Sequence, residues 1–142
     1  VRRGDFVKDD RRLNIDFYEK GLQMIKNNKI NLKYDIFTDD YDWVSQQSIF
    51  QDAENIFGQK SIKNDNSEID GIDAMDDKDE TIETFSRMLR YKHFIVGNSS
   101  FAFWAAYLKS NEDSTVVVPN PWFRNHPHPT LKKNKWCVIE NN

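Results

Sequence analysis

The sequence KHFIVGNSSFAFWAAYL, residues 92–108, decides the fold of this chain. It begins with a continuous apolar segment, His93–Val96, of the kind that lies buried on both faces of a parallel sheet. After a Gly-Asn-Ser-Ser break, apolar residues recur at helical spacing, at Phe101, Trp104 and Leu108. This change of period predicts a strand that turns directly into a helix.

Three short polar side chains, those of Asn98, Ser99 and Ser100, fall where this helix is predicted to begin. Such side chains can cap backbone N–H groups that have no partner within the helix. The same terminus attracts phosphate, because its free N–H donors and the positive end of the helix dipole point the same way. The turn by itself is also compatible with ordinary capping between two buried elements.

Composition limits the classes of protein that the chain can represent. Its 142 residues are enough for one domain and equally suit part of a larger protein. No apolar run approaches the roughly 20 residues of a membrane span. Twenty basic and 23 acidic residues give a net charge of −3, so no global positive field is available to bind nucleic acid. The single cysteine, Cys137, favours a reducing compartment and is interpreted as a small buried residue.

Strand-like and helix-like segments alternate along the chain, which predicts an α/β fold: a Rossmann-like, mostly parallel sheet with helices on both faces. A single domain is expected over residues 1–142, and the polar, acidic residues 58–79 are expected to form a surface loop. Neither GxGxxG nor GxxxxGK[ST] occurs, which argues against a dinucleotide dehydrogenase and a P-loop ATPase. Strands are predicted at residues 33–38, 55–57, 93–96, 115–118 and 135–139, and helices at 15–27, 79–92 and from 100 onward.

The first residues place Arg2, Arg3 and Asp5 around Gly4, a residue that lets the backbone turn tightly. Two arginines can bind a diphosphate through paired hydrogen bonds, and a nearby carboxylate can fix the position of one guanidinium. A solvated basic turn is the alternative interpretation.

Carboxylates follow the strand predicted at residues 33–38, where open α/β sheets bind their ligands. Asp39 or Asp40 could accept hydrogen bonds from a purine or from a ribose hydroxyl. Either could instead cap the helix that follows, and the two roles are compatible. Metal binding by this acidic group would need further oxygen ligands that the local sequence does not clearly supply.

Two other patterns resemble metal sites only in part. Residues 66–77 partly resemble a calcium-binding loop. Their last residue is Asp77, whereas such a loop needs a Glu there that binds the ion with both carboxylate oxygens. His126 and His128 lack a third ligand at suitable spacing and are separated by proline. No metal site is therefore predicted.

Four segments, taken together, resemble the successive motifs of the bacterial and animal α-1,2-fucosyltransferases of glycosyltransferase family 11. They are VRRGDFV at 1–7, IFTDDYDW at 36–43, MLRYKHFIVGNSSFAFWAAYL at 88–108 and VVVPNPWF at 116–123. Their order and spacing match across nearly the whole chain. The family's first motif is His-x-Arg-Arg-x-Asp, and this chain starts just after the His position.

The resemblance implies the C-terminal, donor-binding half of a GT-B glycosyltransferase that uses GDP-L-fucose as its substrate. Arg2 would contact the β-phosphate and stabilise the departing GDP, and either Asp39 or Asp40 would face guanine or its ribose. The implied catalytic residue is Arg2, and the implied donor-binding residues are Arg3, Asp5, Asp39, Asp40, Asn98, Ser99, Ser100 and Phe101.

Further expectations come from the same resemblance. They are inversion at the transferred sugar, no metal and no cofactor, a galactoside-containing glycan as acceptor, and a cytoplasmic enzyme that is compatible with peripheral membrane association. The 142-residue piece alone is expected to be inactive. The family commonly has Cys where Tyr91 stands, and often Ser-Phe-Ser-Trp-Trp at residues 100–104, which leaves acceptor preference open. The alternatives are a related transferase that uses another sugar nucleotide, and a non-catalytic binding module.

Overall fold

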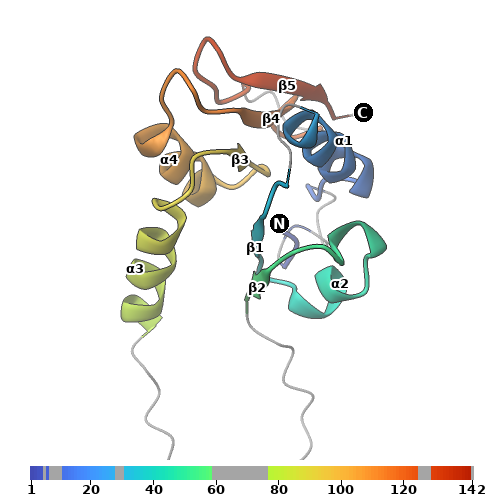
Figure 1. The fold of residues 1–142 in the computed structure, drawn as a ribbon, viewed down its shortest axis with the longest axis vertical. Coiled ribbons are helices and arrows are strands. Elements are labelled where there is room, and N and C mark those ends of the chain that lie inside the picture. The colour runs from blue at the N-terminus through green and yellow to red at the C-terminus, as the bar shows by residue number, and fades with distance from the viewer. Residues whose placement is uncertain (5, 7–10, 28–30, 59–76, 125–128, 142) are drawn as a thin grey trace, which may run out of the picture.

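The computed structural model describes residues 1–4, 6, 11–27, 31–58, 77–124 and 129–141, the side chains of 77–79 excepted, and shows an α/β arrangement (Figure 1). Its elements, in chain order, are α1 (Ile15–Lys26), β1 (Asp35–Phe37), α2 (Tyr41–Ser45), the 3-10 turn η2 (Ser48–Phe50), β2 (Asn55–Phe57), α3 (Asp77–Met88), β3 (Phe94–Ile95), α4 (Ser100–Lys109), β4 (Val116–Asn120) and β5 (Cys137–Glu140).

All strand pairs among the described residues are parallel, as predicted. β1 pairs with β2, placing Ile36 opposite Ile56, and β4 pairs with both β3 and β5. The strands nevertheless form two sheets, ordered β1-β2 and β3-β4-β5, where the sequence predicted one. The prediction of one continuous sheet is therefore wrong for the part of the chain that the structure describes.

Residues of both sheets line a common open cavity. The cavity measures about 1180 Å³, and residues of both β1 and β3 line it, among them Ile36 and Ile95. Val1 lies at its border, and the Val1 nitrogen donates a hydrogen bond to the carbonyl oxygen of Phe37.

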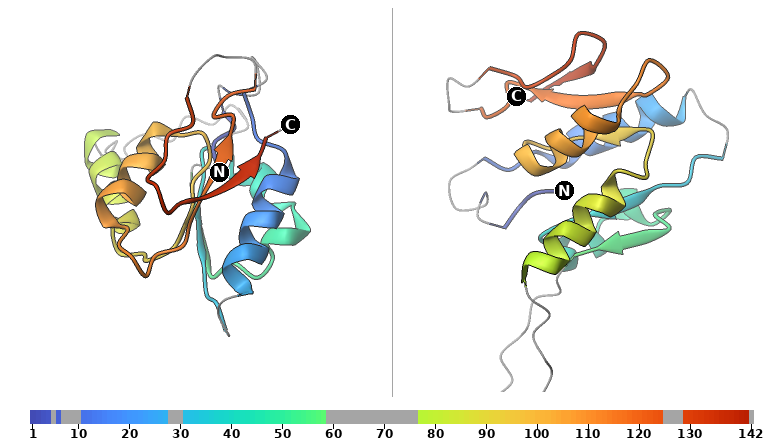
Figure 2. Two further views of the ribbon diagram at one scale, coloured as in Figure 1. Left: turned by 90° about the horizontal axis from the view of Figure 1, so that it is seen from above. Right: turned by 90° about the vertical axis from the view of Figure 1, so that its left-hand side faces the viewer.

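Strand β4 is the centre of the larger sheet, and its side chains alternate between two apolar clusters. Val117 packs with α1 and β5, whereas Val116 and Val118 pack with α4 and two tryptophans. All three valines are at most 1% exposed. The view from above in Figure 2 accordingly shows α1 and α4 on opposite sides of β4. Helices on both faces of a parallel sheet, as predicted, are confirmed for these three strands.

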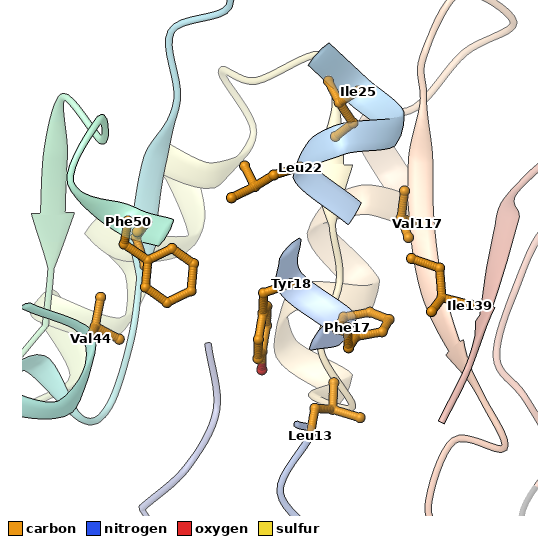
Figure 3. Packing of buried hydrophobic residues seen from close by; sticks show 10 residues of the cluster. Leu13, Phe17, Tyr18, Leu22, Ile25, Val44, Phe50, Val117 and Ile139 are labelled. Carbon is orange, nitrogen blue, oxygen red and sulfur yellow. The ribbon is translucent and has the colours of Figure 1, made fainter. Parts of the chain in front are cut away.

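Helix α1 forms where apolar residues recur at helical spacing, and it buries one face in the first cluster (Figure 3). Phe17, Tyr18, Leu22 and Ile25 are each at most 7% exposed. Gly21 lies on the same face, where an added Cβ would come within 3.1 Å of the Ile95 side chain. The absence of a side chain at Gly21 therefore lets α1 approach β3 closely.

The predicted bounds differ from the observed ones mainly at element ends. Helix α3 begins at Asp77, two residues before its predicted start, and ends at Met88 where residue 92 was predicted; β3 contains two residues. The Asn14 side chain makes no capping hydrogen bond to α1. The short helix α2 and the turn η2 lie between β1 and β2. Residues 59–76, most of the predicted acidic loop, and both histidines of the 126–128 pair lie outside the described residues.

Tyr91 connects the segment after α3 to the smaller sheet. Its hydroxyl donates a hydrogen bond to Asp35 at the start of β1, and its ring packs edge-on against Phe37 with centroids 5.7 Å apart. Burial, followed by the hydrogen bond to the Asp35 carboxylate, raises the pKa of Tyr91 to about 12. The hydrogen bond favours the neutral phenol, so the native state holds this proton more tightly than the unfolded chain.

The shifted pKa of Tyr91 predicts a loss of stability at high pH. Its contribution is fully present below the ordinary tyrosine pKa of about 10 and is lost as the pH rises through about 12. The free energy of unfolding of the unmodified protein should exceed that of Tyr91→Phe at pH 8, and the difference should shrink by pH 12. Urea denaturation of both proteins at several pH values measures this difference in the free energy of unfolding. Tyr107→Phe, at a tyrosine 41% exposed, is the control. A difference independent of pH would contradict the assignment.

Candidate functional site

The N-terminal segment lies against the carboxyl end of β1. Besides the bond from Val1 to Phe37, the backbone nitrogen of Arg3 donates to the Asp39 Oδ1 atom at 2.7 Å. The order of these contacts, Val1 with Phe37 and Arg3 with Asp39, shows that the segment runs in the same direction as β1. The two arginines predicted as phosphate ligands are therefore fixed at the end of a strand.

Arg2 forms an ion pair with Asp39, with its Nη1 atom 2.8 Å from Oδ2. These two atoms are close enough for an ion pair, but they are not aligned for a hydrogen bond. The Arg2 side chain is 40% exposed and the Asp39 side chain 24%. Asp39 thus neutralises part of the charge of Arg2 while leaving the guanidinium accessible to a ligand.

Gly4 lies so close to this pair that a side chain at this position would meet the Asp39 carboxylate. A Cβ atom on Gly4 would lie 2.7 Å from the Asp39 Oδ2 atom. This distance is too short for a carbon and an oxygen that are not bonded, so a larger residue must displace the carboxylate. The glycine of the Arg-Arg-Gly motif therefore permits the contact between the N-terminal segment and Asp39.

Arg3 and Asp40 make a second, less exposed pair. The Arg3 Nε atom donates to Asp40 Oδ2 at 3.2 Å, and the Arg3 guanidinium carbon lies 3.7 Å from the centroid of the Trp43 ring. Asp40 Oδ1 accepts a hydrogen bond from the backbone nitrogen of Trp43 at 3.1 Å. Asp40, rather than Asp39, is therefore the cap of α2, and Arg3 is held between a carboxylate and an aromatic ring.

The turn between β3 and α4 supplies the opposite side of the site. The Ser99 side chain accepts a hydrogen bond from the Ala102 nitrogen at 3.5 Å and caps α4, as predicted for this helix start. The Ser99 nitrogen itself donates to the carbonyl oxygen of Gly97 at 2.7 Å. Ser100 and Phe101 are the first helical residues, whose N–H groups have no carbonyl partner within the helix.

Asn98 is 1% exposed, and the nitrogen and oxygen atoms of its side-chain amide have different surroundings. Its Nδ2 atom donates to the backbone carbonyl oxygen of Arg11, which fixes the orientation of the amide. Its Oδ1 atom is buried and has no hydrogen-bond partner among the residues that the structure describes. A buried acceptor of this kind is costly unless a ligand or solvent donates to it.

These residues meet around a cavity of about 620 Å³, a volume typical of small-molecule sites. Its lining includes five of the predicted site residues, from both the N-terminal segment and the start of α4. Asp39 lines the larger cavity, which shares Arg2, Ser99 and Phe101 with the smaller one. The five predicted residues in the smaller cavity are Arg2, Asn98, Ser99, Ser100 and Phe101.

Four predicted residues stand outside this smaller cavity or outside the described structure. Arg3, Asp39 and Asp40 are absent from its lining, and Asp5 lies outside the described residues. Their predicted contacts with the donor remain predictions. For Asp40, the carboxylate oxygens already bind Arg3 and the start of α2.

The sequence interpretation missed the aromatic and basic residues that complete the smaller cavity. Trp122 and Phe123 come from the turn after β4, which entered the sequence interpretation only as part of the family motif at 116–123. Phe6 and Arg11 come from the N-terminal region. The adjacent arginines at positions 11 and 12 were the available signal, but charge alone does not tell which of them faces a cavity.

The described residues hold no group of three or more His, Cys, Asp or Glu side chains that could bind a metal ion. No helix in the described part of the chain is both long enough and apolar enough to cross a membrane.

Comparison with known proteins identifies one family. The family model described as Glycosyl transferase family 11 matches residues 1–140. An alpha-1,2-colitosyltransferase of Escherichia coli is 27% identical over 150 residues, covering 99% of this chain and 46% of that protein. The O-antigen biosynthesis glycosyltransferase WbnK of Escherichia coli is 27% identical over 149 residues, covering 98% and 43%. The chain therefore spans less than half the length of these relatives. No solved structure matches it significantly.

The contact between Gly4 and Asp39 predicts an interaction between two substitutions. Gly4→Ala should lower the free energy of unfolding by about 1–3 kcal/mol, because its Cβ collides with the Asp39 carboxylate. In an Asp39→Ala background that carboxylate is gone, so the same substitution should cost much less. Urea denaturation of the four proteins measures the coupling. Additive effects of the two substitutions would show that the close approach does not exist in solution.

Proposed function

Because the chain belongs to glycosyltransferase family 11, we propose that it forms the donor-binding part of a fucosyltransferase. In this proposal the full enzyme transfers L-fucose from GDP-L-fucose to a galactoside hydroxyl, forming an α-1,2 linkage. The observation that carries the proposal is the family match over residues 1–140, together with the position of Arg2 beside the start of α4 on one cavity. We further propose the GT-B architecture for the full enzyme.

The proposed reaction is a direct displacement with inversion. The acceptor hydroxyl attacks the anomeric carbon of fucose, the bond from that carbon to the β-phosphate oxygen breaks, and a general base takes the hydroxyl proton. Negative charge then grows on the diphosphate of the departing GDP. A fixed guanidinium near that group stabilises the transition state more than the ground state. We assign this role to Arg2, and no residue of this chain is assigned as the general base.

The start of α4 would hold the phosphates on the side opposite Arg2. The N–H groups of Ser100 and Phe101 are available for an anion, because Ser99 has already capped the helix through Ala102. Capping and phosphate binding therefore do not compete for the same donors. Fixed backbone dipoles of this kind act without reorganisation during the reaction.

Asp39 has a positioning role in the proposal. Its ion pair holds Arg2 at the border of the two cavities, where the Arg2 side chain is 40% exposed and the Asp39 side chain 24%. Arg3 in turn ties the same segment to Asp40 and Trp43. The paired carboxylates would thereby keep the Arg2 guanidinium in one place as charge develops on the leaving group.

A second candidate differs only in the sugar. One relative is named as an alpha-1,2-colitosyltransferase, which favours transfer of colitose as the alternative to fucose.

The name of the other relative connects it with O-antigen biosynthesis, so a bacterial surface polysaccharide is the acceptor class that we propose. We place this reaction in the cytoplasm, with peripheral membrane association compatible with it. A non-catalytic sugar-nucleotide-binding module is the remaining alternative.

The proposed phosphate contacts predict how GDP binding responds to substitution. In the full-length natural protein, Arg2→Ala should weaken GDP binding about tenfold or more, the effect of losing a charge-assisted hydrogen bond. Ser100→Ala should weaken it less if its backbone N–H is the main donor. Isothermal titration calorimetry measures both. The matched controls are Arg12→Ala and Ser45→Ala, at exposed residues outside both cavities. GDP affinity unchanged by both test substitutions would contradict the site assignment.

The choice of donor is tested by competition on the full-length protein. Fucosyl transfer to a galactoside should be inhibited by GDP-mannose less strongly than by GDP, and UDP-sugars should inhibit least. Nucleotide-activated colitose offered beside GDP-L-fucose distinguishes the two candidate sugars by the product formed. Transfer from a UDP-sugar alone would exclude both candidates and leave a related transferase with another donor. Nucleotide binding without transfer to any galactoside would favour the non-catalytic module.

A further inference from the structure

We propose that the outer face of α4 binds the surface of an anionic membrane. This outer face consists of Trp104, Tyr107, Leu108 and Lys109 of the helix, together with Lys132 and Lys133 of the segment beside it. The inference rests on the proposed function in one respect, the peripheral membrane association of the enzyme. It does not depend on which donor the enzyme uses.

Helix α4 carries apolar side chains on two sides. Ala105 and Ala106 are fully buried, and Ala106 packs in the cluster of β4. Trp104, Tyr107 and Leu108, whose spacing places them together on another side of the helix, are 53%, 41% and 63% exposed. A helix that covers a sheet normally presents polar residues to solvent. The exposed apolar side chains therefore indicate a second partner for α4.

Large apolar side chains that are exposed are concentrated at this helix. The described residues include five such side chains, and four of them are on α4 or on the segment beside it. The fourth is Leu131, which lines the cavity at the start of α4. The fifth is Ile82 on α3, a helix that contacts α4. Single exposed apolar residues are ordinary, whereas a group of them marks an interaction surface.

Basic residues lie beside this apolar group. The Nζ atom of Lys133 donates to the Tyr107 carbonyl oxygen and lies 4.3 Å from the centroid of the Tyr107 ring. Lys109 is the last residue of α4, and Lys132 is exposed. The two carboxylates that follow α4 are balanced by other lysines, in the pairs Lys135–Glu112 and Lys92–Asp113. The outer face is therefore positively charged, although the whole chain has a net charge of −3.

The chemistry of the outer face fits anionic lipids better than a protein partner. Tryptophan and tyrosine side chains are enriched at the level of lipid headgroups, and lysine side chains extend from apolar surface to anionic groups. Protein interfaces, by contrast, are depleted in lysine and enriched in arginine. The outer face holds three lysines and no arginine. An anionic membrane accommodates both its apolar side chains and its charges.

Membrane binding through the outer face fixes the distance of the candidate site from the membrane. The proposed phosphate donors, the N–H groups of Ser100 and Phe101, are at the start of the same helix. Since α4 has 10 residues, it is about 15 Å long, and the site lies within about that distance of the bound headgroups. Trp104 and Lys132 line neither cavity, so the membrane and the nucleotide contact different side chains.

The test measures how the full-length natural protein sediments with vesicles. Vesicles of phosphatidylcholine mixed with phosphatidylglycerol should bind it more tightly than phosphatidylcholine alone, and added salt should weaken the binding. Trp104→Ser should lower the affinity about tenfold, whereas Trp104→Tyr should retain most of it. Lys132→Ser should lower the affinity about fivefold. The matched control is Lys20→Ser, at an exposed lysine of α1 on the other side of β4, which should have no effect (Figure 2).

A fluorescence measurement covers the case in which Trp104→Ser does not fold. Lipids with brominated chains should quench the natural protein more than Trp104→Tyr, because Trp104 is the tryptophan that enters the membrane. Equal quenching of the two proteins would overturn the proposal. Acrylamide should likewise quench the natural protein more when no vesicles are present. If it does not, another part of the protein covers the outer face, and the proposed membrane contact is wrong.

GDP binding by the same proteins separates this inference from the proposed function. If the protein binds GDP but its binding to anionic vesicles is absent, or is unchanged by both Trp104→Ser and Lys132→Ser, the membrane contact alone is overturned. If it binds vesicles as predicted but does not bind GDP, the proposed donor is wrong and the membrane contact stands. Loss of vesicle binding with GDP binding intact in both variants supports the inference.

Discussion

The burial of β4 between two apolar clusters is the constraint on which the rest of the larger sheet depends. Val117 contacts the cluster of α1, and its neighbours Val116 and Val118 contact that of α4. A strand buried on both faces must pair along both edges, and β4 does so with β3 and β5. This fixes the end of β3 and hence the start of α4, where the candidate phosphate donors lie.

The other half of the site depends on charge rather than apolar packing. Asp39 and Asp40 follow β1 and bind two consecutive arginines of the N-terminal segment. One pair leaves Arg2 accessible, whereas the other holds Arg3 against Trp43 with its side chain only 12% exposed. Neighbouring residues of the same type thus take different roles: Arg2 faces the cavity, and Arg3 fixes the segment.

Much of the fold could be predicted because it follows from local patterns. The helical spacing of apolar residues predicted the first residue of α1 and its last residue to within one position, and β-branched residues identified β4. The element ends were less well predicted, since α3 begins two residues before its expected start at residue 79 and ends at Met88 rather than at residue 92. The arrangement into two sheets could not be predicted, because periodicity shows which residues are buried and not which strands pair.

The sequence by itself determined the class of fold, the family resemblance and the capped start of α4, since each depends on residues close together in the chain. Only the tertiary structure decided that Asp40 caps α2 while Asp39 pairs with Arg2, and that Arg11 joins the cavity. Arg11 is placed by Asn98 and Phe123, which lie far from it in sequence. The physical reason is that capping and periodicity act over one turn of helix, whereas the orientation of a charged side chain depends on whatever the fold packs against it.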